Sequence, residues 1–178
     1  MSKNNNFILS VLNVLSWIIF IGLCVEAGAL IFNFVFTLFK PIATNNIYKG
    51  LNLSDLFENH FPHYIGLMSL VIVISLLKAY LFYLVVNIFM KLNLVKPFSS
   101  EIAKLIEKIS YEALAIGIVS AVAHHYTKRL IHSGYEVNQI EEYWNDIAAF
   151  LMMAAILFVI SQIFRKGIEL QNENDLTV

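Results

Sequence analysis

Two ionisable side chains stand inside long apolar runs of this sequence. Glu26 lies in the run that begins at Phe7, and Lys78 lies at the middle of YIGLMSLVIVISLLKAYLFYLVVNIFM. A charged side chain at mid-membrane costs roughly 3 kcal/mol on insertion scales, so such residues usually pair or mark an ion or substrate path. Because Glu26 and Lys78 fall at comparable depths, we expect an ion pair between them. The pair would act either as a proton or substrate counter-ion site or as a contact that fixes helix register.

The histidines form a second candidate site, because all of them fall towards one expected face of the membrane. They are His60, His63, His124, His125 and His132. Imidazoles with nearby carboxylates can bind zinc or copper, or can respond to pH. The sequence has no His-Glu-x-x-His motif, and Pro62 interrupts the first pair. Loop and interfacial histidines are therefore the favoured interpretation, and a metal site is the alternative.

Motifs for other chemistries are missing from the sequence. It contains no Gly-rich phosphate loop, nucleophile elbow or paired-carboxylate motif, so we expect neither an enzyme nor a bound cofactor. It also lacks a basic stripe with interleaved aromatic residues, which argues against direct nucleic-acid binding. The single cysteine, Cys24, excludes an internal disulfide and any multi-cysteine metal site.

The elements that must position these residues are membrane helices. The chain has 178 residues, of which 58% are hydrophobic and 14% are charged. A soluble domain is usually about 25% charged. A hydrocarbon core about 30 Å thick takes roughly 20 helical residues. The composition therefore predicts a single all-α domain, a multi-pass transmembrane helical bundle whose surrounding partner is the lipid bilayer.

Four segments are candidates for spans. They cover about residues 17–39, 64–90, 109–130 and 143–164. Tyr143 and Trp144 would lie in the interfacial belt where the fourth span begins. The third span is the weakest candidate, because the short uninterrupted apolar core at 113–123 is also typical of a re-entrant or interfacial helix.

The remaining residues form two outer loops, one inner segment and a tail. The outer loops are 40–63 and 131–142, the inner segment is 91–108, and the cytoplasmic tail is 165–178. Ser54 is a candidate N-cap for a short amphipathic helix in the first loop. Ser99 or Ser100 is a candidate N-cap for a helix that begins after Pro97.

The orientation follows from the lysines and arginines, which gather on the cytoplasmic side of a membrane protein. With both termini on one side, that side holds Lys3, Lys91, Lys96, Lys104, Lys108, Arg165 and Lys166. The opposite side holds Lys40, Lys49, Lys128 and Arg129. This excess predicts a plasma- or inner-membrane protein with both termini in the cytoplasm.

Two stretches together resemble a known family. One is Pro97-Phe98-Ser99, which opens a helix after the second span, and the other is the terminal IELQNENDLTV. The combination resembles a bacterial membrane family catalogued as domain of unknown function 2975. The resemblance implies four spans, and it provides no catalytic activity that can be carried over to this chain. It also implies a cytoplasmic partner, a small helix-turn-helix transcriptional regulator encoded beside members of the family.

The C-terminal residues fit a docking role. They are Glu173, Asn174, Asp175, Leu176, Thr177 and Val178. A terminal carboxylate that follows an apolar residue can be captured by a backbone nest, although a frayed helix end is the simpler alternative. We therefore expect a non-enzymatic membrane protein that regulates or anchors a cytoplasmic partner. A small transporter that uses Glu26 and Lys78 and an outer-face metal-binding protein are the alternatives, and a homo-oligomer stays open.

Overall fold

The chain folds almost entirely into helices. A computed structural model describes residues 3–92 and 98–175; it is 89% helical, and these residues contain no β-strand. The elements in chain order are α1 (Lys3–Phe39), η1 (Pro41–Asn46), η2 (Tyr48–Gly50), α2 (Ser54–Asn59), α3 (Phe61–Lys91), α4 (Ser100–His132), η3 (Asn138–Tyr143) and α5 (Ile147–Asp175).

Local sequence explains where these helices begin and end. Pro41 ends α1, because the residue before a proline avoids the helical region, and Lys40 has φ −132° and ψ 87°. Ser99 caps α4, as one of the two alternatives predicted, and its side-chain oxygen accepts a hydrogen bond from the backbone N–H of Ile102 at 3.2 Å. Ser54 is instead the first residue of α2 rather than its cap, and both its N–H and its hydroxyl donate to Asn52 Oδ1.

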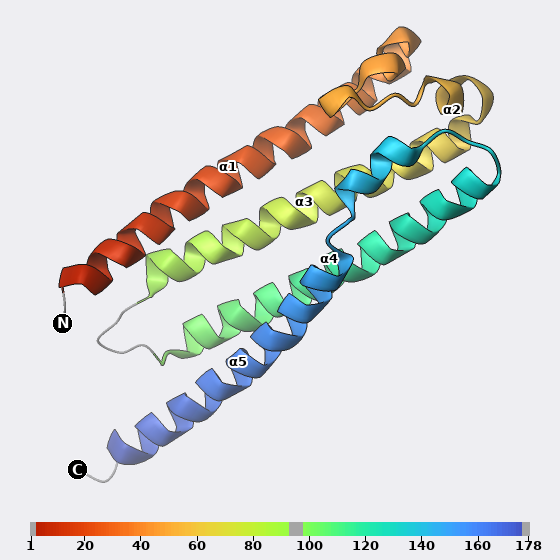
Figure 1. Cartoon of the computed structure of the whole chain (residues 1–178). Coiled ribbons are helices and arrows are strands. Elements are labelled where there is room, and N and C mark those ends of the chain that lie inside the picture. The colour runs from red at the N-terminus through yellow and green to blue at the C-terminus, as the bar shows by residue number, and fades with distance from the viewer. Residues whose placement is uncertain (1–2, 93–97, 176–178) are drawn as a thin grey trace.

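The four long helices lie in a row, each antiparallel to the next (Figure 1). α1 packs on α3, α3 on α4, and α4 on α5. Among the described residues α1 has no comparable packing against α4 or α5, so the row is open and does not close into a bundle. Both termini lie at one end of the row, which we call the terminal end (Figure 1).

The opposite end carries a compact cap, which consists of η1, η2, α2 and residues 133–146. Its apolar core encloses the first half of α3, where Tyr64, Leu67 and Met68 are fully buried. The hydroxyl of Tyr64 also shares a hydrogen bond with that of Thr37 on α1. The last part of the cap folds back along the row, so that α5 begins beside the middle of α3 and α4 (Figure 1).

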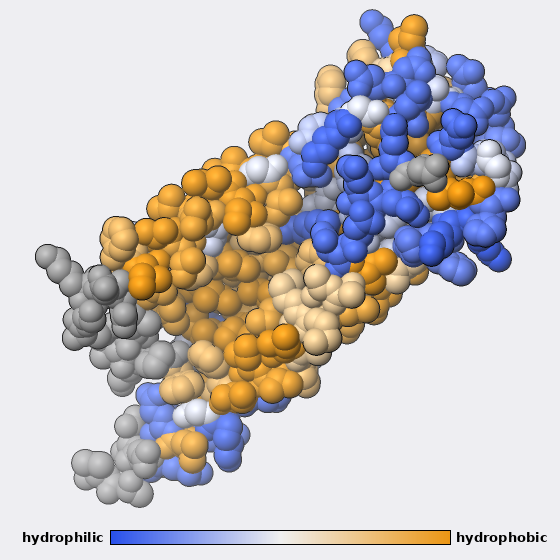
Figure 2. Space-filling view, in the orientation of Figure 1, coloured by the Kyte–Doolittle hydropathy of each residue, from blue (hydrophilic) through white to orange (hydrophobic). Residues whose placement is uncertain are grey.

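The outer surface of the row is apolar. Within the described residues, three helical segments are long and apolar enough to cross a membrane: Phe7–Phe39, Phe61–Lys91 and Gln139–Glu173. Large side chains such as Phe32 and Val25 remain 67% and 63% exposed. Figure 2 shows hydrophobic residues along the helices and hydrophilic residues gathered on the cap. Contiguous apolar surface of this extent is typical of contact with lipid, which supports a membrane location.

Several expected boundaries differ from the structure. The first helix begins at Lys3, ahead of the span expected from about residue 17, whereas α4 begins at Ser100, as expected for a helix capped by Ser99 or Ser100 after Pro97. The last helix begins at Ile147 instead of residue 143, because Tyr143 belongs to η3. Trp144, expected at the membrane interface, is 1% exposed within the cap core. The expected tail is helical as far as Asp175.

Candidate functional site

Lys78 lies near the middle of α3 and points towards the cap. Its Nζ donates a hydrogen bond to the backbone carbonyl of Tyr143 at 3.2 Å. That carbonyl is free to accept because Tyr143 ends η3 and the chain leaves the helical path there. The ammonium also lies 5.5 Å from the centre of the Phe150 ring near the start of α5, a cation–π distance. Lys78 thus ties α3 to the junction between the cap and α5.

Glu26 of α1 forms its ion pair with a residue of the cap. Nζ of Lys49 lies 3.1 Å from Glu26 Oε1. Lys49 has φ +62°, a left-handed conformation that costs a non-glycine residue on the order of 1 kcal/mol. The turn is completed by Gly50 at φ +81°, which glycine adopts without this cost. The strained turn directs the lysine back towards α1.

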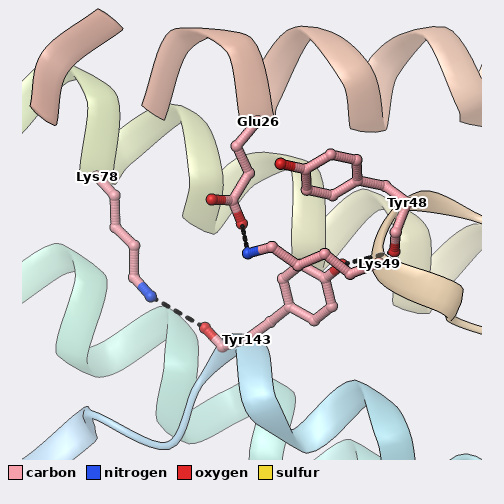
Figure 3. A network of polar contacts seen from close by, with 5 residues as sticks. All are labelled: Glu26, Tyr48, Lys49, Lys78 and Tyr143. Atoms are coloured by element: carbon pink, nitrogen blue, oxygen red, sulfur yellow. Dashed lines mark hydrogen bonds and ion pairs between the residues drawn. The ribbon is translucent and has the colours of Figure 1, made fainter. Parts of the chain in front are cut away.

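These contacts form one polar cluster, shown in Figure 3. The hydroxyl of Tyr143 donates to the carbonyl of Tyr48, which immediately precedes Lys49, at 3.3 Å. The cluster therefore joins α1, α3 and both halves of the cap through Glu26, Tyr48, Lys49, Lys78 and Tyr143 (Figure 3).

The predicted ion pair between Glu26 and Lys78 is wrong in its partners. Glu26 pairs with Lys49, while Lys78 binds the Tyr143 carbonyl, and among the described residues the two form no salt bridge with each other. The physical reason is that the first loop folds back between the helices and brings a nearer cation to Glu26. Both residues do face the same cluster, as the expectation of matched depth requires (Figure 3).

The cluster is reached from the cap side. A pocket of about 210 Å³ opens beside it, lined by Lys49, Gly50, Leu51, Gln139, Glu142 and Tyr143. Towards the terminal end, a buried apolar core that includes Leu81, Leu84 and Ile116 fills the space between the helices. The geometry suits a set of polar contacts that hold the cap on the helices. A transport path through Glu26 and Lys78 would have to pass this apolar core.

Within the described residues, the histidines do not gather into a metal site. The rings of His60 and His63 each lie edge-on to the ring of Tyr135 in the cap, and His63 Nδ1 lies 2.8 Å from the Tyr126 hydroxyl. His124 faces Glu141, with 3.8 Å between Nδ1 and Oε1. Within residues 3–92 and 98–175, no group of three His, Cys, Asp or Glu side chains is placed to hold a metal ion.

At the terminal end, α5 packs against the start of α4 through residues about two turns before its own end. Arg165 pairs with Glu107 at 2.5 Å, and the Phe164 ring packs edge-on against Phe98. A side chain at Gly167 would lie within 3 Å of the Phe98 ring, so the glycine permits this close contact. The predicted docking residues Glu173, Asn174 and Asp175 continue α5. The others, Leu176, Thr177 and Val178, lie outside the described residues.

A protein-family model matches most of the chain. The family described as "Protein of unknown function (DUF2975)" matches residues 43–178. The chain belongs to the DUF2975 family. The resemblance predicted from its sequence is therefore confirmed. The match includes the cap, α3, α4 and α5, and it begins after α1. Neither the curated proteins nor the solved structures contain a match for the chain.

Three members of the polar cluster in this DUF2975 protein escaped prediction: Tyr48, Lys49 and Tyr143. In the predicted topology Lys49 is one of the four cations on the outer side, and the following Gly50 is the signal of a tight turn that can reverse its direction. The carbonyl of Tyr143 carries no sequence signal at all, because every residue has one. Glu107 and Arg165, which fasten the terminal end, are far apart in the sequence and likewise give no local signal.

Proposed function

We propose that the chain is a four-span, non-enzymatic protein of the bacterial inner membrane that holds a cytoplasmic partner on the end of α5. α1, α3 and α5 supply three spans by length and composition. α4 supplies the fourth, since it runs antiparallel between α3 and α5 and returns the chain from the terminal end to the cap (Figure 1). Its lower hydropathy fits this position, because neighbours cover much of it and only Tyr111, Leu114, Ile118 and Val122 expose an apolar stripe.

The orientation places the terminal end in the cytoplasm. The excess of lysine and arginine at that end favours this side. The cap, which carries both outer loops, then faces the opposite compartment. A partner that binds the terminal end is therefore a cytoplasmic one.

One observation supports the docking role above the others. α5 runs without interruption from the polar cluster, where Phe150 lies beside Lys78, to Asp175 beyond the apolar part of the helix. The helix is held on the start of α4 at Phe164, Arg165 and Gly167, and the residues after Gly167 extend past these contacts. A continuous helix held at this point can present a partner-binding surface and connect it to the cap.

The surface of this extension suits a protein partner. After Lys166 the helix is polar, yet Leu170 is 51% exposed on it. An exposed apolar side chain on a helix that extends past the membrane can supply one anchor for a partner groove, which usually takes apolar residues spaced by three and four. The family resemblance suggests that the partner is a helix-turn-helix regulator.

Removal of the extension tests this proposal. We expect deletion of residues 169–178 to abolish co-purification of the neighbouring regulator while membrane insertion is retained, because the contacts of Arg165 and Phe98 remain. Leu170→Ser should weaken co-purification about tenfold by removing one apolar anchor. Glu58→Gln, on the cap, is the matched control and should leave it unchanged. Undiminished recovery of the regulator by the deleted protein would refute the docking role.

A further inference from the structure

A continuous groove follows the cap end of α4. Its upper part is a pocket of about 660 Å³ beside His63, Lys128 and His132. Its lower part is a pocket of about 570 Å³ beside Ile118 and Val122. The two pockets share His125, Tyr126 and Arg129, so they form one groove rather than two.

The lower part of the groove is apolar. Ile118 and Val122 are 53% and 58% exposed, and with Ala121 they line it. Gly117 forms its floor, because Leu151 of α5 lies where a side chain would project: a Cβ there would come within 2.6 Å of Leu151 Cδ2. Residues spaced by three and four share one face of a helix, so Ile118, Val122 and Arg129 follow one another along α4.

The upper part of the groove is cationic. Lys128 and Arg129 line it together with His125 and His132, and no carboxylate lies among the described lining residues. Within the described part of the chain neither Lys128 nor Arg129 forms a salt bridge. Arg165 and Lys91, at the terminal end, each pair with a glutamate. Among the described residues, the groove therefore holds two cations, Lys128 and Arg129, that form no salt bridge.

We propose that this groove binds one anionic phospholipid, with the phosphate on Arg129 and Lys128 and an acyl chain along Ile118 and Val122. A guanidinium matches a phosphate with two parallel hydrogen bonds, and a lysine ammonium beside it adds a second charged contact to the same headgroup. The length also fits. Ile118 lies about 16 Å along the helix from Arg129, and one leaflet of a hydrocarbon core is about 15 Å thick.

This inference rests on the proposal that α4 lies in the bilayer, and it is independent of the partner at the end of α5. Purified full-length protein in detergent is offered phosphatidylglycerol or phosphatidylcholine, and lipid adducts are counted by native mass spectrometry. We expect phosphatidylglycerol to bind preferentially and Arg129→Gln to weaken its binding about tenfold, because a charge-assisted contact is lost. Arg129→Lys should restore part of the binding.

Two further variants separate the groove from general electrostatic attraction. Ala121→Phe fills the apolar part without touching a charge, and it should also abolish the adduct. Lys40→Gln removes a cation near the cap end of α1, away from the groove, and should have no effect. An excess of inorganic phosphate should not compete, because the acyl chain supplies part of the affinity.

Each outcome decides the proposal. Equal binding of both lipids, an unchanged adduct in Arg129→Gln or Ala121→Phe, or equal loss in Lys40→Gln would overturn it. Full competition by inorganic phosphate would replace the lipid with a free anion. Loss of the adduct in Arg129→Gln counts in support only if that variant keeps the circular dichroism spectrum and elution volume of the parent. If it does not, Ala121→Phe decides.

Discussion

At the scale of single residues, the polar cluster shows how a buried charge finds its partner. A lysine within an apolar helix needs an acceptor, and any carboxylate at the same depth is a reasonable candidate. In the structure, Lys78 donates a hydrogen bond to the backbone carbonyl of Tyr143, and Glu26 forms its ion pair with Lys49. Lys49 is 55% exposed, so its ion pair contributes at most about 1 kcal/mol, comparable to the strain of its own left-handed backbone. The cap is therefore held mainly by Lys78 and by apolar burial.

Lys78→Met tests whether the hydrogen bond to Tyr143 holds the cap. The substitution keeps the length of the side chain but removes the donor, and it leaves the partly buried Tyr143 carbonyl without its partner, at a cost of about 1–3 kcal/mol. We expect the folded-back segment of the cap to loosen. The measurement is faster cleavage by a glutamate-specific protease at Glu141 and Glu142 in detergent.

The control for this experiment is Lys91→Met, at the terminal end of the same helix. Lys91 contacts Glu101 and is far from the cap in the row. Equal cleavage rates in Lys78→Met and the parent protein would show that the hydrogen bond to Tyr143 does not hold the cap.

At the scale of elements, glycine decides which helices approach closely. Gly117 of α4 faces Leu151 of α5 at a distance that leaves no room for a side chain, whereas Gly28 of α1 has nothing within 4 Å. Helices in a membrane gain their association from such close packing, since lipid is as apolar as their side chains. The α4–α5 pair accordingly has the most extensive contact in the row. Among the long helices, α1 packs on α3.

A pair of matched substitutions tests this difference. We expect Gly117→Leu to push α4 and α5 apart and to destabilise the protein by about 1–3 kcal/mol, because overpacking forces side chains and backbone to shift. Gly28→Leu should be neutral or slightly stabilising, since it removes a helix-weakening glycine at an open position. Thermal unfolding in detergent measures both. Similar melting temperatures for the two variants would contradict the contact at Gly117.

At the scale of the whole molecule, the open row makes a prediction about topology. Cys24→Ser provides a cysteine-free background, because Cys24 is the single cysteine. Single cysteines are then placed at Asn52 or Glu136 in the cap, or at Asn172 near the end of α5, all exposed. If all four long helices cross the membrane with cytoplasmic termini, a membrane-impermeant maleimide labels the first two in intact cells. Asn172→Cys reacts only after permeabilisation.

The alternative topology gives a different pattern. If α4 did not cross the membrane, the two segments of the cap that hold Asn52 and Glu136 would face different compartments. The maleimide would then label only one of Asn52→Cys and Glu136→Cys in intact cells. Labelling of Asn172→Cys alone in intact cells would mean that the orientation is reversed. Western blotting of labelled and mock-treated cells distinguishes these patterns.

The sequence by itself determined the helical class, three apolar segments long enough to cross a membrane, a helix cap at Ser99 or Ser100, and the family. Length and hydropathy are local properties that a chain carries with it into any fold, and a cap requires only residues a turn apart. The apolar surroundings of Glu26 and Lys78 in the sequence also indicated that both side chains need polar partners at a similar depth. The sequence could not assign their partners, because both contacts depend on how the two loops fold back.

Only the tertiary structure decided which groups meet. The cap turns Lys49 towards α1, buries Trp144 and sets the start of α5 beside the middle of α3. It also leaves one face of α4 uncovered, so that cationic and apolar residues line one groove there. The spacing of residues along a single helix cannot show which face its neighbours leave open. The physical reason is the same in each case: a hydrogen bond or an ion pair needs atoms within about 3–4 Å, and packing between distant segments sets those distances.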